Sequence, residues 1–405
     1  MIRRALTGER VPFVLTVLAV WTLLRIVTTT ILLWVTYAEQ DPSVFTGTQP
    51  PFFDVAILWD GKWYQRIAVE GYPGELPVDA AGDVQQNPWA FYPVFPLTVR
   101  LLMGGTGLPF GVAATAVATV LGYAAALAIA GLLRHLVGAP GALAAVALVG
   151  AFPAAPTLQV AYTESLALLL LATVLWLLVR RRWLPAAGVA LLTGLARPIA
   201  LPLGLVALVA VLVRWRSRHE EPISRGEGLG MVSALAACAA SGLIWPAVAW
   251  VRTGRPDAYT VTMSAWRQGE PITPFVPTVE VTQLLFGDLR GPLLLLGAGG
   301  LLVLAVAGPW ARGLGVELRT WCLAYPLYLA AALDPWTSIY RYLLPLFPLF
   351  VLLVGAGWAR DDRRGRQPGW LLGVRTAVLV TLFVGWQVWW TWELFRFVPP
   401  SDFPP

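Results

Sequence analysis

The stretch PFGVAATAVATVLGYAAALAIAGLL, residues 109–133, contains no charged side chain and decides the class of fold. A helix of about 20 apolar residues crosses the roughly 30 Å hydrocarbon core of a membrane. Further apolar runs lie at 12–36, 140–155, 164–179, 184–197, 199–213, 229–251, 291–309, 318–333, 340–358 and 370–392. These runs predict an all-α polytopic membrane protein of about eleven transmembrane helices, forming one integral membrane domain over residues 1–405.

The composition supports a membrane protein and argues against a nucleic-acid partner. Hydrophobic residues make up 57% of the chain and charged residues 13%, about half the charged share of a soluble domain. The net charge of +6 comes from small basic groups between apolar runs, which is typical of membrane-protein loops. Cys238 and Cys322 lie inside apolar runs, so we expect neither a disulfide framework nor a metal site there.

The distribution of charge predicts the topology. With the N-terminus inside and 184–213 forming two spans, 17 basic and 7 acidic residues fall on the cytoplasmic side, against 10 and 16 outside. A single kinked span at 184–213 would put Arg180–Arg182 and the basic group at 214–225 on opposite sides, against the positive-inside rule. We therefore expect a multi-pass plasma-membrane protein with a cytoplasmic N-terminus. The proline-rich stretch 89–103 is expected to be a juxtamembrane or re-entrant helix.

Two long loops, 37–90 and 252–290, are predicted to form an extracytoplasmic active-site face. In the first, FFDVAILWDGKWYQRIAVEGY (52–72) has a helical pattern, with an aromatic stripe that suits the membrane interface. Asp60 lies at the border of that stripe, between Trp59 and Trp63. It is either a solvated residue of an anchor helix or a half-buried carboxylate that acts as a base.

The inventory of outer-face residues restricts the chemistry. His135 and His219 are predicted to be cytoplasmic, and the sequence contains no HExxH, CxxC or GxSxG motif. The predicted cytoplasmic loops are too short for a Gly-rich nucleotide-binding unit. Acid–base chemistry on the outer face must therefore use a carboxylate. An activated substrate present there is expected to be carried by a lipid.

Six motifs carry a resemblance to a known family. WDGKWYQRIAVEGY (59–72) and FYPVFPLTVRLL (91–102) resemble the first outer loop of the PIG-V family, the second mannosyltransferase of glycosylphosphatidylinositol synthesis and its bacterial relatives. AYTESLALLL (161–170), GLARPIALP (194–202) and YRYLLPLFPLF (340–350) follow in the order that family shows, and SAWRQGEPITP (264–274) resembles its later loop.

The resemblance implies a GT-C type glycosyltransferase that needs no metal or other cofactor. Such an enzyme moves mannose, with inversion, from polyprenyl-phosphate mannose to a hydroxyl of a glycan, glycolipid or protein acceptor. Asp60 matches the family's first-loop aspartate and is expected to take the acceptor's proton. Asp54 is the rival base. Cations are needed where charge grows on the departing phosphate, and the candidates on the outer side are Arg341, Arg197, Arg267 and Lys62.

Other residues are expected to orient substrates or shape the site, and each has a structural alternative. The expected set is Trp59, Trp63, Tyr64, Glu70, Tyr92, Glu164, Trp266, Gln268 and Tyr340. Glu164 could simply occupy the first turn of a helix, with Thr163 or Ser165 as the N-cap. Arg341 could mark the membrane interface, and Arg197 could stabilise a helix break at Pro198.

Two other functions remain open from the sequence. One is transfer of a different lipid-linked sugar, such as arabinofuranose or glucose. The other is a lipid flippase or transporter, a class that often has inverted repeats with paired broken helices. The sequence has no corresponding halves, and its broken helices lie mainly in the first half, which favours the enzyme.

Overall fold

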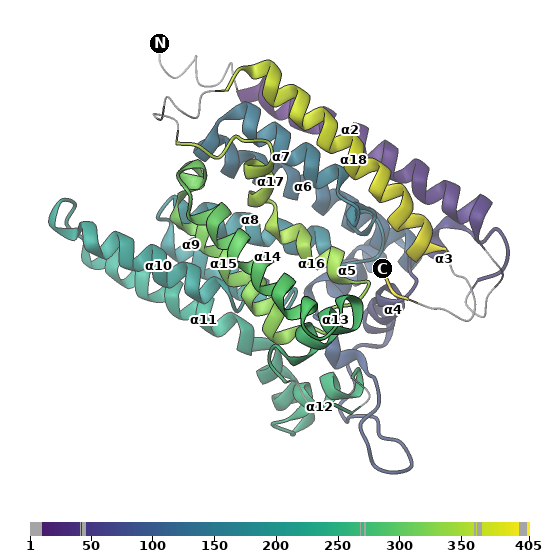
Figure 1. The fold of residues 1–405 in the computed structure, drawn as a ribbon. Helices are drawn as coiled ribbons and strands as arrows, with labels where there is room; N and C mark the ends of the chain where they lie inside the picture. Colours follow the sequence, from purple (N-terminus) through teal and green to yellow (C-terminus); the bar gives the residue numbers. More distant parts are fainter. Residues whose placement is uncertain are drawn as a thin grey trace.

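All eleven apolar runs are helical in the computed structural model of the chain (Figure 1). The structure describes residues 10–40, 42, 46–267, 269–270, 273–359, 362, 367–396 and 403–405. Within these ranges every regular element is a helix, apart from one bridge between Val78 and Val84. The predicted all-α membrane fold is confirmed.

The helices formed by the apolar runs follow the expected order. They are α2 (Arg10–Trp34), α6 (Phe110–Val137), α7 (Ala139–Ala151), α8 (Glu164–Val179), α9 (Trp183–Gly194), α10 (Leu203–Arg216), α11 (Arg225–Thr253), α14 (Arg290–Ala307), α15 (Gly315–Ala332), α16 (Ile339–Leu343) with α17 (Pro348–Leu353), and α18 (Gly369–Phe395). Short helical turns extend or join them at η1 (Val35–Glu39), η3 (Ala155–Leu158), η4 (Ser217–His219), η5 (Pro309–Leu314) and η6 (Leu344–Leu346).

Five helical segments are long and apolar enough to cross a membrane on their own: Pro12–Glu39, α6, α11, α14 and α18. The shorter apolar helices α7, α8 and α9 are packed among other helices. A short or interrupted helix is tolerated at membrane depth when protein surrounds it, because its neighbours satisfy the freed backbone groups.

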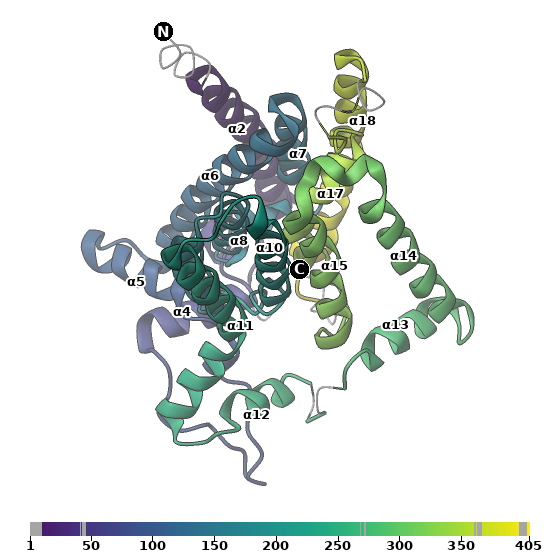
Figure 2. The same ribbon diagram turned by 90° about the vertical axis from the view of Figure 1, so that its left-hand side faces the viewer.

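Helix α8 lies at the centre of the bundle. It packs against α6, α9 and α15, and most of its side chains are buried. Figure 1 shows α2 and α18 side by side along one edge, where both also contact α7. Figure 2 shows α14 on the outside of the bundle. The side chains of Leu293, Leu296 and Leu301 on this helix are exposed. An apolar helix with leucines exposed along its length suits contact with lipid.

The run at 184–213 forms two helices, as the charge distribution predicted. Helix α9 ends at Gly194 and α10 begins at Leu203. Pro198 and Pro202 lie in or beside this connection, and proline has no N–H to continue a helical ladder. The connection holds Arg197 at the point where the chain reverses direction.

The first of the two predicted outer loops, residues 37–90, corrects one expectation. Residues 52–72 form two helices, α3 (Phe52–Val55) and α4 (Asp60–Glu70), rather than one. The Ala56 carbonyl accepts a hydrogen bond from the N–H of Ala161 at 2.9 Å, so it is not used to continue a helix. Trp59 then adopts a φ of 52°, uncommon for a non-glycine residue, and Asp60 becomes the first residue of α4.

The stretch 89–103 is helical as predicted, apart from a break at residues 91–93, and the second long loop adds two short helices. Its helices are η2 (Pro88–Ala90) and α5 (Val94–Thr106). The second long loop contains α12 (Ala258–Ala265) and α13 (Val276–Phe286). Contacts of η2 with both α4 and α12 bring the two outer loops together.

Candidate functional site

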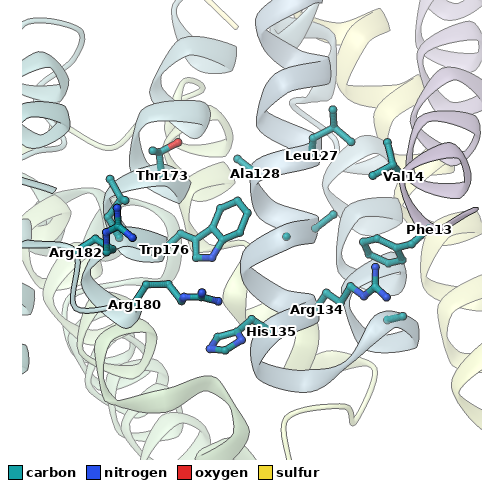
Figure 3. A pocket seen from close by; sticks show the side chains of 14 residues that line it. Phe13, Val14, Leu127, Ala128, Arg134, His135, Thr173, Trp176, Arg180 and Arg182 are labelled. Atoms are coloured by element: carbon teal, nitrogen blue, oxygen red, sulfur yellow. The ribbon is translucent and has the colours of Figure 1, made fainter. Parts of the chain in front are cut away.

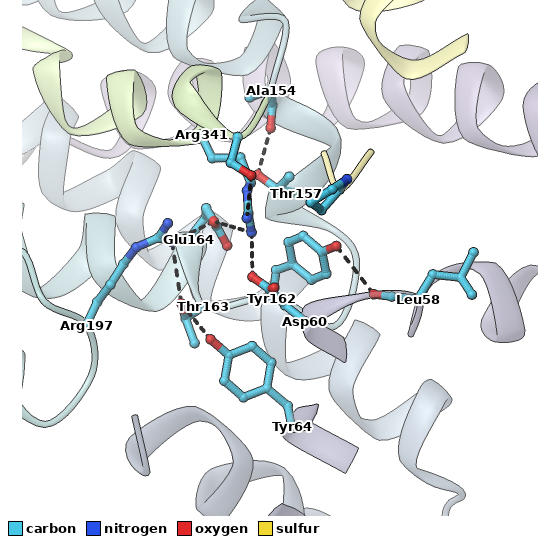
Figure 4. Close-up of polar contacts among 12 residues, drawn as sticks. Leu58, Asp60, Tyr64, Ala154, Thr157, Tyr162, Thr163, Glu164, Arg197 and Arg341 are labelled. Atoms are coloured by element: carbon cyan, nitrogen blue, oxygen red, sulfur yellow. Dashed lines mark hydrogen bonds and ion pairs between the residues drawn. The ribbon is translucent and has the colours of Figure 1, made fainter. Parts of the chain in front are cut away.

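Four charged side chains from distant parts of the sequence meet at the N-terminal end of α8 (Figure 4). Arg341 Nη1 donates a 2.6 Å hydrogen bond to Asp60 Oδ2 and approaches Glu164 Oε1 at 3.4 Å. Arg197 Nη1 lies 2.5 Å from the same Glu164 oxygen. We call Asp60, Glu164, Arg197 and Arg341 the charged quartet.

Each member of the quartet lies at a helix end or beside a break. Asp60 begins α4, and Glu164 begins α8, where an acidic side chain suits the positive end of the helix dipole. Thr163 occupies the N-cap position of α8 without a side-chain capping bond, and Glu164 lies in the first turn as its structural alternative expected. Arg197 precedes the proline of the α9–α10 connection, and Arg341 lies on the short helix α16.

The quartet is buried except at Asp60. The exposed fraction of the side chain is 3% for Glu164, 5% for Arg341 and 9% for Arg197, but 27% for Asp60. Two carboxylates and two guanidinium groups balance in charge, which a buried cluster requires. Asp60 is therefore the member of the quartet most accessible from outside the bundle.

Two polar atoms of the quartet are left without a hydrogen-bond partner among the described residues. They are Glu164 Oε2 and Arg341 Nε, and both are buried. An unsatisfied buried polar atom is costly, and in a native structure it calls for an explanation such as a bound ligand. Ionisable groups at membrane depth are also rare outside functional sites.

Aromatic rings and hydroxyl groups surround the two arginines. Arg341 lies 5.0 Å from the ring centre of Tyr162, and Arg197 lies 4.8 Å from that of Tyr342. Thr163 Oγ1 accepts long hydrogen bonds from Arg197 Nη1 at 3.4 Å and from the Tyr64 hydroxyl at 3.5 Å. Burial, reinforced by the charge of Asp60, raises the pKa of Tyr64 above its usual value, so this hydroxyl stays a donor.

A second group of aromatic side chains joins the two outer loops. Trp63 stacks on Phe91 with ring centres 5.6 Å apart, and Trp266 packs edge-on against both, at 5.2 and 5.5 Å. The Nε1 atom of Trp266 is buried without a hydrogen-bond partner among the described residues. The predicted residues Trp63 and Trp266 are therefore in contact, although some 200 positions separate them in the sequence.

The other predicted aromatic residues pack elsewhere in the fold. The Tyr92 hydroxyl lies 3.2 Å from that of Tyr259. The ring of Trp59 packs edge-on against Phe395, and Tyr340 packs in the same way against Trp386. Helix α18 thus packs against the start of α4 and against α16.

The remaining predicted residues lie outside the quartet. Arg267 pairs with Asp334 at 2.6 Å and donates to the Ala332 carbonyl at 2.7 Å, which ties the second outer loop to the end of α15. Glu70 is exposed and pairs with Arg66 one turn earlier in α4. Lys62 and the rival base Asp54 are exposed, and Gln268 lies outside the described residues.

Sequence reasoning missed four side chains that touch the quartet. They are Tyr162, Thr163, Ser338 and Tyr342. Three of them, Tyr162, Thr163 and Tyr342, lie inside the quoted motifs, one or two positions from Glu164 or Arg341, so a search of the residues around those two would have found them. Ser338, whose Oγ accepts from Arg341 Nη2 at 3.2 Å, carries no separate signal.

Comparison with known proteins adds no relative. A scan against protein families finds no match to this chain, and neither does a search of curated proteins. The functional argument therefore rests on the site itself.

Proposed function

We propose that this protein is an inverting glycosyltransferase that moves mannose from polyprenyl-phosphate mannose to an acceptor hydroxyl on the extracytoplasmic face. The observation that carries the proposal is the position of the Arg341 guanidinium, in contact with the carboxylates of both Asp60 and Glu164. The four quartet residues belong to four of the six motifs that carry the family resemblance, and they converge at one point.

In the proposed reaction Asp60 acts as the general base. A sugar hydroxyl is a weak nucleophile, so a carboxylate removes its proton as the hydroxyl oxygen bonds to C1 of the mannose. The bond between C1 and the phosphate oxygen breaks, and its electron pair stays on the phosphate. Asp60 is the most exposed member of the quartet, which suits direct contact with an acceptor.

The charges of the quartet balance through this reaction. When Asp60 takes a proton, Arg341 loses one anionic partner. At the same moment the phosphate diester becomes a monoester and gains negative charge. Arg341 is then available to neutralise the leaving group, with Arg197 held behind it by Glu164. One arginine thus links the base to the leaving phosphate.

A lipid flippase is the second candidate. Helix breaks between α9 and α10 and between α16 and α17 both lie beside the quartet, and transporter sites are often formed by discontinuous helices. The break between α16 and α17 lies in the second half of the chain, where the sequence did not indicate a broken helix. A flippase would move the donor lipid but form no new glycosidic bond.

The decisive experiment incubates the purified full-length protein with radiolabelled polyprenyl-phosphate mannose and membrane extract. We expect label in a new glycan, glycolipid or protein, and at least about 10²-fold slower labelling with the Asp60→Asn variant. Parallel reactions with polyprenyl-phosphate glucose or arabinofuranose test the sugar. Transbilayer movement of the donor without a labelled product would replace the enzyme with the flippase.

A further inference from the structure

A second charged region lies at the opposite end of α8 from the quartet, in a pocket between α2, α6 and α8 (Figure 3). The pocket has a volume of about 1150 Å³, above the 300–1,000 Å³ usual for small-molecule sites. Val14, Leu127 and Leu177 contribute to its apolar walls. Four basic side chains line it as well, and none of its described lining residues is acidic: Arg134, His135, Arg180 and Arg182.

Three consecutive arginines, Arg180–Arg182, follow α8, and their side chains point in two directions. Arg181 has a φ of 53°, at a helix-ending position that glycine usually occupies. The N–H of Arg182 donates to the Leu177 carbonyl at 2.8 Å, and that of Arg181 donates to the Leu178 carbonyl at 2.9 Å. The Arg181 side chain pairs with Glu221 in the α10–α11 loop, while Arg180 and Arg182 line the pocket.

Stabilisation of helix ends explains only part of this arrangement. Basic residues in the last turn of a helix interact favourably with its dipole, which accounts for Arg134 and His135 on α6. It does not account for Arg180 and Arg182, which line an open, partly apolar pocket beside them. At Gly131 a Cβ would lie 2.6 Å from the ring of Trp176, so the glycine leaves room for the indole in the position where it lines the pocket.

We propose that this pocket binds an anionic phospholipid, with its phosphate on Arg180 and Arg182 and an acyl chain between α2, α6 and α8. Guanidinium groups match the geometry of phosphate oxygens. Basic pockets between transmembrane helices on the cytoplasmic side are a known setting for such headgroups, and the charge distribution predicts that this end faces the cytoplasm. The site is separate from the quartet and does not depend on glycosyl transfer.

Charge complementarity selects this occupant over two others. A zwitterionic phospholipid would fill the apolar walls but bring no net negative charge to Arg180 and Arg182. A soluble phosphate would meet the arginines but leave the apolar walls uncovered. Only an anionic amphiphile satisfies both parts of the lining.

Native mass spectrometry of the full chain, with added phosphatidylglycerol or phosphatidylcholine, tests the proposal. We expect phosphatidylglycerol to be retained preferentially, and its affinity to fall by roughly tenfold or more in Arg180→Gln/Arg182→Gln. The control is Arg216→Gln/Arg225→Gln, which removes the same charge from exposed positions of the α10–α11 region. Its retention of phosphatidylglycerol should match that of the unmodified protein.

A pocket-filling variant gives an independent measurement. Leu127→Trp keeps all four basic side chains but occupies the apolar wall, so it should also reduce phosphatidylglycerol retention. Equal retention of phosphatidylcholine, equal loss in the control, or displacement of the lipid by inorganic phosphate alone would each overturn the proposal. The remaining outcome is that the full chain retains no phosphatidylglycerol but a variant without residues 1–9 does. That result would overturn the proposal and identify the N-terminal segment as the occupant.

Discussion

Arg341 donates a 2.6 Å hydrogen bond to Asp60, although 281 positions separate the two residues. The contact joins the first outer loop to α16 near the other end of the chain. It also holds the proposed base against the residue proposed to bind the leaving phosphate. Each of the two side chains therefore gives a separate test of the mechanism.

Replacing Asp60 with asparagine keeps the size of the side chain but removes its capacity to accept a proton. We expect mannose transfer to fall by about 10²–10⁴-fold, the usual contribution of a general base. Initial rates with labelled donor would measure the change. Asp54→Asn is the matched control, because Asp54 is an exposed carboxylate of the same loop. Normal activity in Asp60→Asn with loss in Asp54→Asn would transfer the role to Asp54.

Replacing Arg341 tests the charge on the leaving group. Arg341→Ala should raise the barrier by about 3–4 kcal/mol, the cost of removing one preorganised donor at such a site. Arg341→Lys should recover only part of the rate, since a point charge does not reproduce the two-pronged guanidinium. Full activity in Arg341→Ala would rule out this arginine as the phosphate ligand. Arg267→Ala is a useful comparison, because Asp334 already engages that guanidinium.

The apolar runs were enough to predict the helices, but not the break within 52–72. A continuous apolar run is a local signal, and such runs located the long helices of the bundle, although the run at 340–358 divides into α16, η6 and α17. The break at Trp59 depends on the hydrogen bond from the N–H of Ala161 to the Ala56 carbonyl, a contact between segments far apart in the sequence. Such a contact leaves no periodic trace in either segment.

The residues of the candidate site were predictable from the sequence, but their contacts were not. Asp60, Glu164, Arg197 and Arg341 were identified as candidates because each is an ionisable residue within a motif. Which of the candidate cations would meet the carboxylates was not predictable, because the answer depends on how the helices pack. The pairing of Arg267 with Asp334 instead of the quartet is a clear case.

A chelator should leave the proposed transfer activity unchanged. Asp60 and Glu164 both already face the Arg341 guanidinium, so a divalent ion would have to displace it. No group of three or more His, Cys, Asp or Glu side chains gathers anywhere in the described ranges. Transfer rates measured with and without EDTA should agree within error. Loss of activity that manganese or magnesium restores would contradict the arginine mechanism.

Cysteine labelling can test the predicted topology. In a background where Cys238 and Cys322 are replaced by alanine, Asp79→Cys should react with an impermeant thiol reagent on intact cells, and Glu220→Cys should not. Both positions are exposed in the structure, so both should react after permeabilisation. Labelling of Glu220→Cys on intact cells would reverse the orientation assigned to the α10–α11 loop.

Glu164 is expected to stabilise the fold through its two arginines, and a double-mutant cycle can separate that role from catalysis. Glu164→Gln leaves Arg197 without its closest anion, and a buried ion pair that loses one partner is destabilised by about 3–5 kcal/mol. Removing both charges in Glu164→Gln/Arg197→Gln should restore much of that stability, because no uncompensated charge of the pair remains.

Thermal unfolding of the four proteins in one detergent measures the coupling, and transfer rates measured below the lowest melting temperature report catalysis. Additive losses of stability would mean that the two side chains do not act as a pair. Recovered stability without recovered activity is the expected result, since Arg197 would still be missing from the neighbourhood of the donor phosphate.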